Sequence, residues 1–345
     1  MTHIIVEKNE SGLGTILLNR PEALNALTFE MIEKMKATLE AWRNDDSIKV
    51  ILFSSTSERA LCAGGDMKSM YEAKMAGEDL NEINKFFPNE YSFDEMVHTY
   101  PKPIVANLNG FVMGGGVGFS YGSDYKIVTE TTRWAMPEMK ISFFPDVAAS
   151  YFLNKAPGKT GRYVALTSDT FTAADVLFIN AANVYVKSDD LHTLFTTLNE
   201  TNWHEENIEE KLESIVDQYR TTLQDKGEIE KNFAKINEHF AHETMEEIFA
   251  SLKNDNSEFS QETLKTLQSL SPLSLKVTLE LMKRGENMSL SEAFQMDLVV
   301  ARRFLEIDDF YEGVRSVLVD KDRNPNYYYQ SIEQVPDELV ASFFG

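Results

Sequence analysis

Cysteine is almost absent from this chain. Cys62 is the only cysteine among its 345 residues. A single thiol cannot form a disulfide framework or a cysteine metal cluster, and such sparing use of cysteine is typical of a reducing compartment. Cys62 lies at the apolar end of an expected strand, with no histidine near it in the sequence. We therefore interpret it as a buried structural thiol rather than as a nucleophile.

Long apolar runs are also missing. No stretch of about 18 apolar residues occurs, so we expect no membrane-spanning helix. The N-terminal residues begin in strand-like sequence and lack the basic and apolar pattern of a signal peptide. Together with the single thiol, these absences predict a cytoplasmic location.

Positive charge is scarce. The formal net charge is −22 at pH 7. Such a charge repels phosphate backbones and anionic lipid surfaces, which argues against nucleic acid and membranes as partners. An anionic small ligand stays compatible with it, because charges more than about 8 Å away are screened.

No linker rich in proline, glycine or serine divides the chain, yet its two parts differ in character. The first part alternates short apolar runs with helical ones, which predicts an α/β fold. From about residue 188 onward the sequence becomes charged and helical. We therefore predict an α/β core over residues 1–188 and a helical region over residues 189–345 that packs on it. The expected strands lie at 3–7, 14–19, 49–55, 103–110, 125–130 and 183–187, and the clearest helices at 28–42, 272–284 and 290–305.

A metal site is not predicted. His239, His242 and Glu243 lie close together in the helical region. They lack the H-E-x-x-H order of a zinc helix and supply too few ligands. We interpret them as ordinary helix residues.

Glycine is concentrated in residues 109–124, "NGFVMGGGVGFSYGSD", with five glycines between Gly110 and Gly118. Such a loop could cradle a phosphate, form a serine-hydrolase elbow around Ser120, or present backbone N–H groups to an oxyanion. A phosphate loop of the Walker type needs Lys after its last glycine, where this chain has Phe119. An elbow needs a strand directly before Gly118, where this chain has further glycines. Both interpretations are therefore disfavoured.

The oxyanion interpretation gains from a second loop of the same kind. Gly64 and Gly65 follow the expected strand at 49–55 and precede a helical run. A thioester carbonyl gathers negative charge on its oxygen in the tetrahedral intermediate, and each well-placed N–H donor stabilises it by roughly 3 kcal/mol. Glycine suits such a position, because a Cβ would obstruct the approach of the carbonyl.

Several segments together resemble a known family. "NRPEALNAL", "LCAGGDM", "NGFVMGGGVGFS" and "WAMPEMKISFFPDVAASYFL" resemble the crotonase (enoyl-CoA hydratase/isomerase) superfamily, and more closely its 3-hydroxyisobutyryl-CoA hydrolase branch. The resemblance runs nearly end to end. It implies an α/β spiral of repeated strand-strand-helix turns with a C-terminal helical region. It also implies an acyl-CoA substrate and no cofactor beyond the coenzyme A that the substrate carries.

The same resemblance implies the site residues. The backbone N–H groups of Gly65 and Gly115 would form the oxyanion hole, Glu138 and Asp146 would line the reacting centre, and Glu90 would contact the substrate. The residues themselves agree in part, because Glu138 and Asp146 stand in an otherwise apolar stretch. Carboxylates in such surroundings are candidates for acid, base or nucleophilic work.

Position 118 decides the expected reaction. Hydratases of this superfamily resemble "GGGCE" in the second glycine loop, and the residue that matches their glutamate is Gly118. The loss of that carboxylate favours hydrolysis, in which Glu138 attacks the thioester or activates a water and Asp146 binds the substrate hydroxyl or assists proton transfer. The expected substrates are 3-hydroxyisobutyryl-CoA, as in valine catabolism, and 3-hydroxypropionyl-CoA. Ala148, Ala149 and Ser150 add bulk beside Asp146 where the branch usually has glycines, which bears on the acyl group accepted.

Two other functions stay open from the sequence. One is a hydratase or isomerase of the same fold, and the other is a non-catalytic protein that binds coenzyme A. No oligomeric state is predicted.

Overall fold

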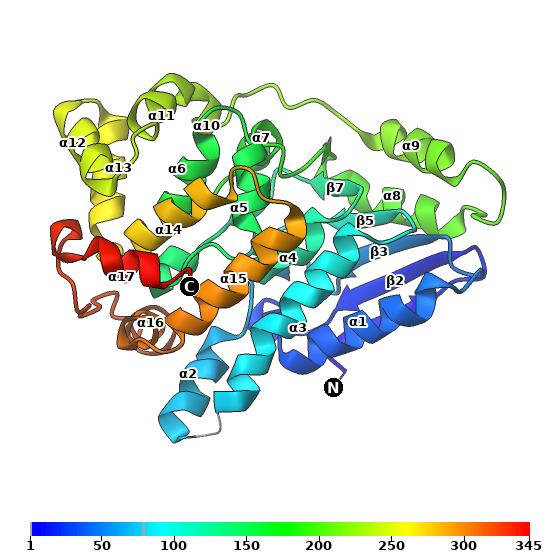
Figure 1. Cartoon of the computed structure of the whole chain (residues 1–345). Coiled ribbons are helices and arrows are strands. Elements are labelled where there is room, and N and C mark those ends of the chain that lie inside the picture. The colour runs from blue at the N-terminus through cyan, green and yellow to red at the C-terminus, as the bar shows by residue number, and fades with distance from the viewer. Residues whose placement is uncertain (1, 78–79) are drawn as a thin grey trace. The chain divides into compact units, whose positions relative to one another are not determined.

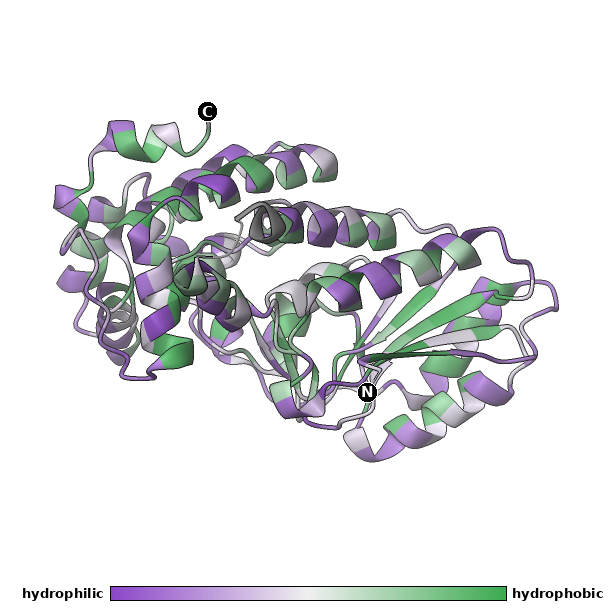
Figure 2. Ribbon diagram, turned by 90° about the horizontal axis from the view of Figure 1, so that it is seen from below, coloured by the Kyte–Doolittle hydropathy of each residue, from purple (hydrophilic) through white to green (hydrophobic). Residues whose placement is uncertain are grey.

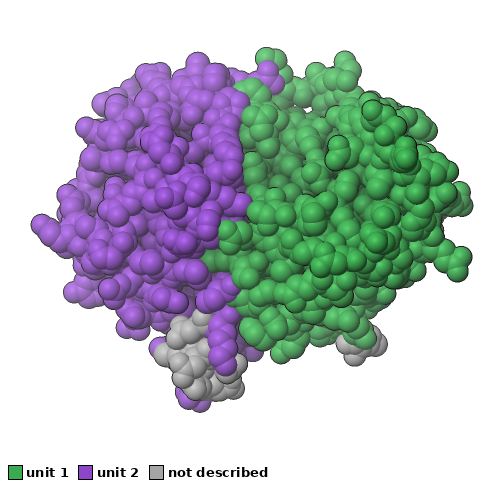
Figure 3. Space-filling view, turned by 45° about the vertical axis from the view of Figure 1, so that its right-hand side comes forward, with its two compact units in different colours: residues 1–65, 89–134, 171–227 green, residues 66–88, 135–170, 228–345 purple. Residues whose placement is uncertain are grey.

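The structure, a computed structural model, describes residues 2–77 and 80–345. Internal contacts group the chain into two compact units, and each unit gathers segments that are far apart in the sequence (Figure 3). Unit 1 comprises residues 1–65, 89–134 and 171–227, and unit 2 comprises residues 66–88, 135–170 and 228–345. These interleaved units reflect contacts within the fold and do not correspond to continuous stretches of sequence. The division into 1–188 and 189–345 therefore stays a prediction.

The larger sheet of unit 1 confirms the predicted α/β class. Its order is β1-β2-β3-β5-β7-β9, and β2, β3, β5 and β7 follow one another across the sheet (Figure 1). β1 runs antiparallel to β2, and the remaining neighbours are parallel. The strands are β1 (Ile4–Lys8), β2 (Leu13–Leu18), β3 (Val50–Ser55), β5 (Ile104–Asn107), β7 (Tyr125–Val128) and β9 (Val184–Tyr185).

A second, smaller sheet is formed by three short strands, each of which follows a strand of the larger sheet in the sequence. It contains β4 (Ala60–Cys62), β6 (Phe111–Met113) and β8 (Arg133–Ala135), in the order β4-β6-β8. Each strand of the larger sheet from β3 to β7 is thus followed by a short strand of the smaller sheet and then by helical chain. This is the repeated strand-strand-helix turn that the sequence predicts.

Helix α1 (Phe29–Arg43) covers one face of the larger sheet. It begins after Thr28, whose hydroxyl accepts a hydrogen bond from the N–H of Met31. The ring of Trp42, in its last turn, lies against Gly14 of β2, where a Cβ would come within 2.6 Å of the ring. Gly14 is therefore required for the close approach of this helix.

The opposite face of that sheet is covered by α8 (Ser188–Glu200) and α9 (Ile208–Tyr219). Leu13, which follows the alternation of the strand and points away from Trp42, shares a buried core with Leu194 and Leu212. A sheet covered on both faces needs strands that are apolar throughout. In Figure 2 its strands are mainly green, whereas most helices carry both green and purple.

Unit 2 is built mainly from helices around α14 (Pro272–Gly285). This helix packs against α5, α6 and α17, and α15 (Leu290–Phe304) also packs against α5. α15 begins with a capping box formed by Ser289 and Glu292. The other helices of the chain are α2 (Met67–Ala76), α3 (Leu80–His98), α4 (Gly115–Tyr121), α5 (Ala149–Phe152), α6 (Thr160–Thr167), α7 (Ala173–Phe178), α10 (Glu228–Lys231), α11 (Phe233–His239), α12 (Met245–Asn254), α13 (Glu258–Gln268), α16 (Asp308–Val314) and α17 (Asp337–Ser342).

Aromatic rings surround the segment of unit 2 that carries the two predicted carboxylates. The ring of Phe143 lies 4.6 Å from that of Phe144, 5.3 Å from that of Phe304 and 5.2 Å from that of Phe310, measured between centroids. On the other side Phe87 stacks on Phe143 at 5.3 Å. Beside this cluster, residues 141–146 are buried.

None of the helices in residues 2–77 and 80–345 is both long enough and apolar enough to cross a bilayer.

Candidate active site

The two glycine loops of unit 1 lie next to each other. Gly64 and Gly65 follow β4, and Gly114 and Gly115 follow β6, which is the parallel neighbour of β4. Parallel neighbours end at the same edge of a sheet, where ligands are commonly bound. A Cβ built on Gly64 would lie 3.6 Å from Cα of Gly114 and 3.7 Å from the backbone nitrogen of Gly115. The backbone of one loop therefore contacts that of the other.

The backbone of both loops is bent in ways that glycine permits. Gly64 has φ of 98° and Gly114 has φ of 50°, both in the left-handed region. α4 then begins at Gly115, and the N–H of this first helical residue has no acceptor inside the helix. Within the described part of the chain, neither Gly65 nor Gly115 donates its N–H in a hydrogen bond. Two backbone donors are thus available at adjacent loop ends.

Glu90 lies directly beside Gly115. It belongs to α3 and is 2% exposed. A Cβ added at Gly115 would overlap Oε1 of Glu90 and would lie 3.2 Å from a methyl carbon of Leu27. The structure therefore brings together Glu90 and Gly115, two of the residues that the resemblance assigns to substrate contact.

Cys62 lies at the end of β4 and is fully buried. Burial raises the pKa of its thiol far above the ordinary range, and the negative charges of Glu90 and Asp94 raise it further. A thiol that keeps its proton is a poor nucleophile. The prediction of a structural thiol is confirmed.

Ser120 lies inside α4, as expected for a helix residue. Its hydroxyl is buried and donates to the carbonyl oxygen of Gly116 at 2.6 Å. The carbonyl of Val117 is a further acceptor at 3.2 Å. A hydroxyl held by the previous helical turn does not project as the exposed nucleophile of an elbow does.

Glu138 opens a short 3₁₀ turn, η2 (Glu138–Ile141), in unit 2. The residue is 7% exposed, and its neighbours Met136 and Phe143 are buried almost completely. Its carbonyl oxygen accepts the N–H of Phe143 at 3.0 Å, which closes the turn on itself. Glu138 is therefore a nearly buried acid in an apolar stretch.

Asp146 follows in the same buried segment and is 5% exposed. Its carbonyl accepts the N–H of Ala149 at 2.9 Å. Val147 and Ala148, directly after it, have φ of 51° and 61°. A tight turn built from two non-glycine residues in the left-handed region therefore carries Asp146.

A third buried acid, Asp297 of α15, meets this turn and was not predicted from the sequence. Its Oδ2 accepts the N–H of Ala148 at 2.7 Å. Ala293, Val300 and Phe304 form the buried face of this helix, and Asp297 lies on the same face, four residues after Ala293. An acid on an apolar stripe is the signal that could have revealed it.

The other polar clusters of the described residues do not offer comparable chemistry. His239 is buried, with Nδ1 at 2.8 Å from Oγ of Ser251 and Nε2 at 3.2 Å from Asp255. Ser260 joins the same network. This network holds α11, α12 and α13 to one another. In the residues described, no three His, Cys, Asp or Glu side chains are grouped as a metal ion would require.

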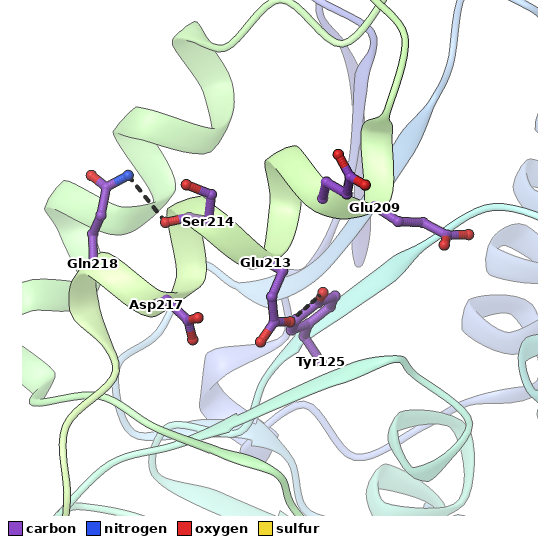
Figure 4. Close-up of a pocket in the computed structure, with 7 residues that line it drawn as sticks. Tyr125, Glu209, Glu213, Ser214, Asp217 and Gln218 are labelled. Carbon is purple, nitrogen blue, oxygen red and sulfur yellow. Dashed lines mark hydrogen bonds between the residues drawn. The ribbon is translucent and has the colours of Figure 1, made fainter.

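A surface pocket of about 780 Å³ in unit 1 is acidic (Figure 4). The hydroxyl of Tyr125, which lines this pocket, donates a hydrogen bond to Oε2 of Glu213 at 2.7 Å. The remaining lining includes Glu209, Glu210 and Asp217. Such a surface repels the phosphates of an acyl-CoA, so we do not assign the substrate to it.

Comparison with known proteins identifies relatives over nearly the whole chain. A sequence model of the enoyl-CoA hydratase/isomerase family matches residues 13–344. The chain is 37% identical over 341 residues to a Gallus gallus protein named "3-hydroxyisobutyryl-CoA hydrolase, mitochondrial", with 99% of this chain and 88% of that protein covered. A Dictyostelium discoideum protein of the same name is 38% identical over 350 residues, with 99% and 91% covered.

A solved structure shares the whole fold. The carnitinyl-CoA dehydratase of Mycobacterium thermoresistibile superimposes with a TM-score of 0.92 at 32% identity, covering 100% of this chain and 97% of that one. This similarity confirms the predicted crotonase-like fold. The two relatives confirm the resemblance to the hydrolase branch. The chain belongs to the enoyl-CoA hydratase/isomerase family.

Proposed function

We propose that this chain hydrolyses acyl-CoA thioesters, with 3-hydroxyisobutyryl-CoA and 3-hydroxypropionyl-CoA as its substrates. Relatives named 3-hydroxyisobutyryl-CoA hydrolase that align with nearly all of the chain support the proposal. The observation that carries it is at position 118. Gly118 is buried in α4, where the family's hydratases have a glutamate, so this helix offers no second carboxylate for alkene hydration.

The proposed reaction begins at the thioester carbonyl. The N–H groups of Gly65 and Gly115 would donate to its oxygen as negative charge develops there, and removal of one such donor typically lowers kcat by about 10²- to 10³-fold. Glu138 would either add to the carbonyl carbon or take a proton from a water that adds to it. Gly65 and Gly115 belong to unit 1 and Glu138 to unit 2. Their proposed action on one substrate rests on the family relationship.

Collapse of the tetrahedral intermediate breaks the bond between carbon and sulfur. When Glu138 acts as a base, the proton it took from water passes to the leaving thiolate, and the products are a 3-hydroxy acid and coenzyme A. When Glu138 acts as a nucleophile, a water must then cleave the resulting anhydride. Asp146 would bind the 3-hydroxyl group or assist the proton transfer, and Glu90 would contact the substrate beside Gly115. The proposed steps use only protein groups and water, so they need no cofactor. Coenzyme A takes part only as a portion of the substrate.

A hydratase or dehydratase is the second candidate, because a carnitinyl-CoA dehydratase shares the fold at 32% identity. Incubation with 3-hydroxyisobutyryl-CoA and with crotonyl-CoA separates the two. We expect release of free thiol from the first and no loss of enoyl absorbance from the second; the opposite pattern would establish the hydratase. Thermal stabilisation by acyl-CoA without any turnover would establish a binding protein.

The cytoplasmic location stays a prediction, and the names of the relatives include "mitochondrial". Fractionation of the source cells, with the chain followed by an antibody, decides between the two locations.

A further inference from the structure

Asp297 is buried more completely than its chemistry would lead one to expect. Its side chain is 0% exposed. Oδ2 accepts the N–H of Ala148 at 2.7 Å, while Oδ1 has no hydrogen-bond partner among the described residues. A buried polar atom without a partner is destabilising, so its retention calls for an explanation.

The hydrogen bond from Ala148 holds a turn that is unfavourable on its own. Val147 and Ala148 both lie in the left-handed region, at φ of 51° and 61°. That conformation costs roughly 1–2 kcal/mol for a residue with a Cβ. Asp146 directly precedes these residues, so the direction of its carboxyl depends on the same turn. The hydrogen bond to Asp297 thus stabilises the backbone turn that contains Asp146.

The surroundings favour the uncharged form of Asp297. No cation pairs with it among the described residues, and Arg302, Arg303 and Glu292 of the same helix are exposed. A carboxylate buried without a cation is strongly disfavoured. Burial raises the pKa of Asp297 well above its ordinary value, and the nearby charge of Asp146 raises it further. Two carboxyls that repel each other in this way are disfavoured as a doubly charged pair.

We infer that Asp297 is a positioning residue for Asp146: buried without a cation, it anchors the Asp146–Ala148 turn as an uncharged acid through the N–H of Ala148. The part of this inference that concerns the substrate rests on the proposed function. The part that concerns the pair of acids does not.

The first test measures stability and needs no substrate. An unfolded chain releases the proton of Asp297 near pH 4, whereas the folded chain keeps it to higher pH. The folded state then binds more protons than the unfolded state, so the contribution of Asp297 to stability is largest below about pH 4 and falls as pH rises toward its folded pKa. Asp297→Asn cannot titrate and avoids this loss. We expect the Tm of Asp297→Asn minus that of the unchanged protein to increase from pH 4 to pH 8. A difference that is constant with pH would show that Asp297 is charged in the folded state and would overturn the inference.

The second test measures the positioning of Asp146. Asparagine keeps an acceptor for the N–H of Ala148, so Asp297→Asn should retain kcat/KM for 3-hydroxyisobutyryl-CoA within about threefold. Asp297→Ala removes the acceptor, and we expect a loss of about 10- to 100-fold, in line with a buried donor left without a partner. The loss should be larger for 3-hydroxyisobutyryl-CoA than for isobutyryl-CoA, which lacks the hydroxyl.

Asp309→Asn is the matched control for the second test. Asp309 is also buried, also accepts a backbone N–H, that of Tyr328 at 2.8 Å, and also has a raised pKa, chiefly through burial. It does not touch the Asp146 turn in the hydrogen bonds described. We expect its ratio of activities on the two substrates to match that of the unchanged protein.

The outcomes separate the two proposals. An equal loss on both substrates for Asp297→Ala, or an Asp297→Asn as impaired as Asp297→Ala, would overturn the positioning role. If the unchanged protein hydrolyses neither thioester, the proposed function fails while the stability test still decides the state of Asp297. Should Asp297→Ala fail to fold, Asp297→Asn and the stability test decide alone.

Discussion

The glycine loops of unit 1 and the segment 138–148 of unit 2 assemble their functional groups from different parts of the chain. In the proposed reaction the loops contribute backbone N–H donors, from Gly65 and Gly115, which have no side chains. Residues 138–148 would contribute carboxyl side chains, which belong to two nearly buried residues, Glu138 and Asp146. Left-handed backbone occurs in both regions, yet only the loops use glycine for it.

Because of this difference, the two regions should respond to different kinds of substitution. If the proposed oxyanion hole is right, the glycine loops are sensitive to added atoms, because a Cβ would fill the space that the thioester oxygen needs. The carboxyl segment is sensitive to changes of charge at constant shape, because burial amplifies each proton gained or lost. Substitutions that add volume in one region and remove charge in the other should therefore have different kinetic signatures.

The largest effect is expected from Glu138→Gln. Glutamine keeps the shape but can neither accept a proton nor attack a carbonyl. Loss of such a group lowers kcat by about 10²- to 10⁴-fold. The measurement is kcat on 3-hydroxyisobutyryl-CoA, with circular dichroism to confirm folding.

Glu258→Gln makes the same chemical change at an exposed position of α13 and should leave kcat unaltered. Near-normal kcat in Glu138→Gln would mean that the catalytic carboxylate lies elsewhere. Residues 138–148 would then not supply the carboxyl group that the proposed reaction requires.

The next largest effect is expected from Gly115→Ala. The added methyl would overlap Oε1 of Glu90 and fill the space beside the N–H of residue 115. We expect kcat/KM to fall by about 10²-fold, close to the loss of one oxyanion donor. Steady-state kinetics on the same thioester check this value.

Gly77→Ala is the control for conformational strain alone. Gly77 has φ of 72°, and a Cβ there would meet nothing within 4 Å. It should lose some stability and no activity. The double variant Gly115→Ala with Glu90→Ala tests whether the carboxyl of Glu90 is what the methyl displaces, since coupled neighbours give non-additive losses. Full additivity would contradict the contact.

A smaller and more selective effect is expected from Asp146→Asn. If Asp146 binds the 3-hydroxyl group, loss of its charge should lower kcat/KM for 3-hydroxyisobutyryl-CoA by about 10- to 100-fold, the range of a hydrogen bond to a charged group. The loss for isobutyryl-CoA should be slight. Equal losses on the two substrates would instead assign Asp146 to the thioester itself.

Local signals in the sequence predict much of the fold. The hydroxyl of Thr28 and the pair Ser289 and Glu292 mark helix starts that the structure confirms. Apolar spacing places Leu39 and Trp42 on the buried face of α1. These features depend on residues within one or two turns of each other, which is why they can be read without a structure.

Features that depend on distant contacts could not be predicted in the same way. The strands β4, β6 and β8 have three residues each, too few to show a period of two. Nothing near Asp297 in the sequence indicates that the N–H of Ala148, 149 residues away, is its partner. The glycines of the candidate site are visible in the sequence, whereas the burial of its acids follows from tertiary packing.

The smallest effect is expected from Ser120→Ala, although a motif search would choose this residue first. Ser120 is the centre of a literal G-x-S-x-G match, but its hydroxyl donates to the carbonyl of Gly116 within α4. That carbonyl also serves the ordinary backbone ladder of the helix, so removal of the hydroxyl leaves no acceptor without a partner, and such back-bonding contributes little to helix stability. We expect kcat to change by less than about tenfold, which corresponds to roughly 1.4 kcal/mol. The assay is kcat on 3-hydroxyisobutyryl-CoA, measured beside Glu138→Gln in one preparation. Loss of activity in Ser120→Ala together with its retention in Glu138→Gln would make the glycine loop a nucleophile elbow, and the division between backbone donors in unit 1 and carboxyl groups in unit 2 would be wrong.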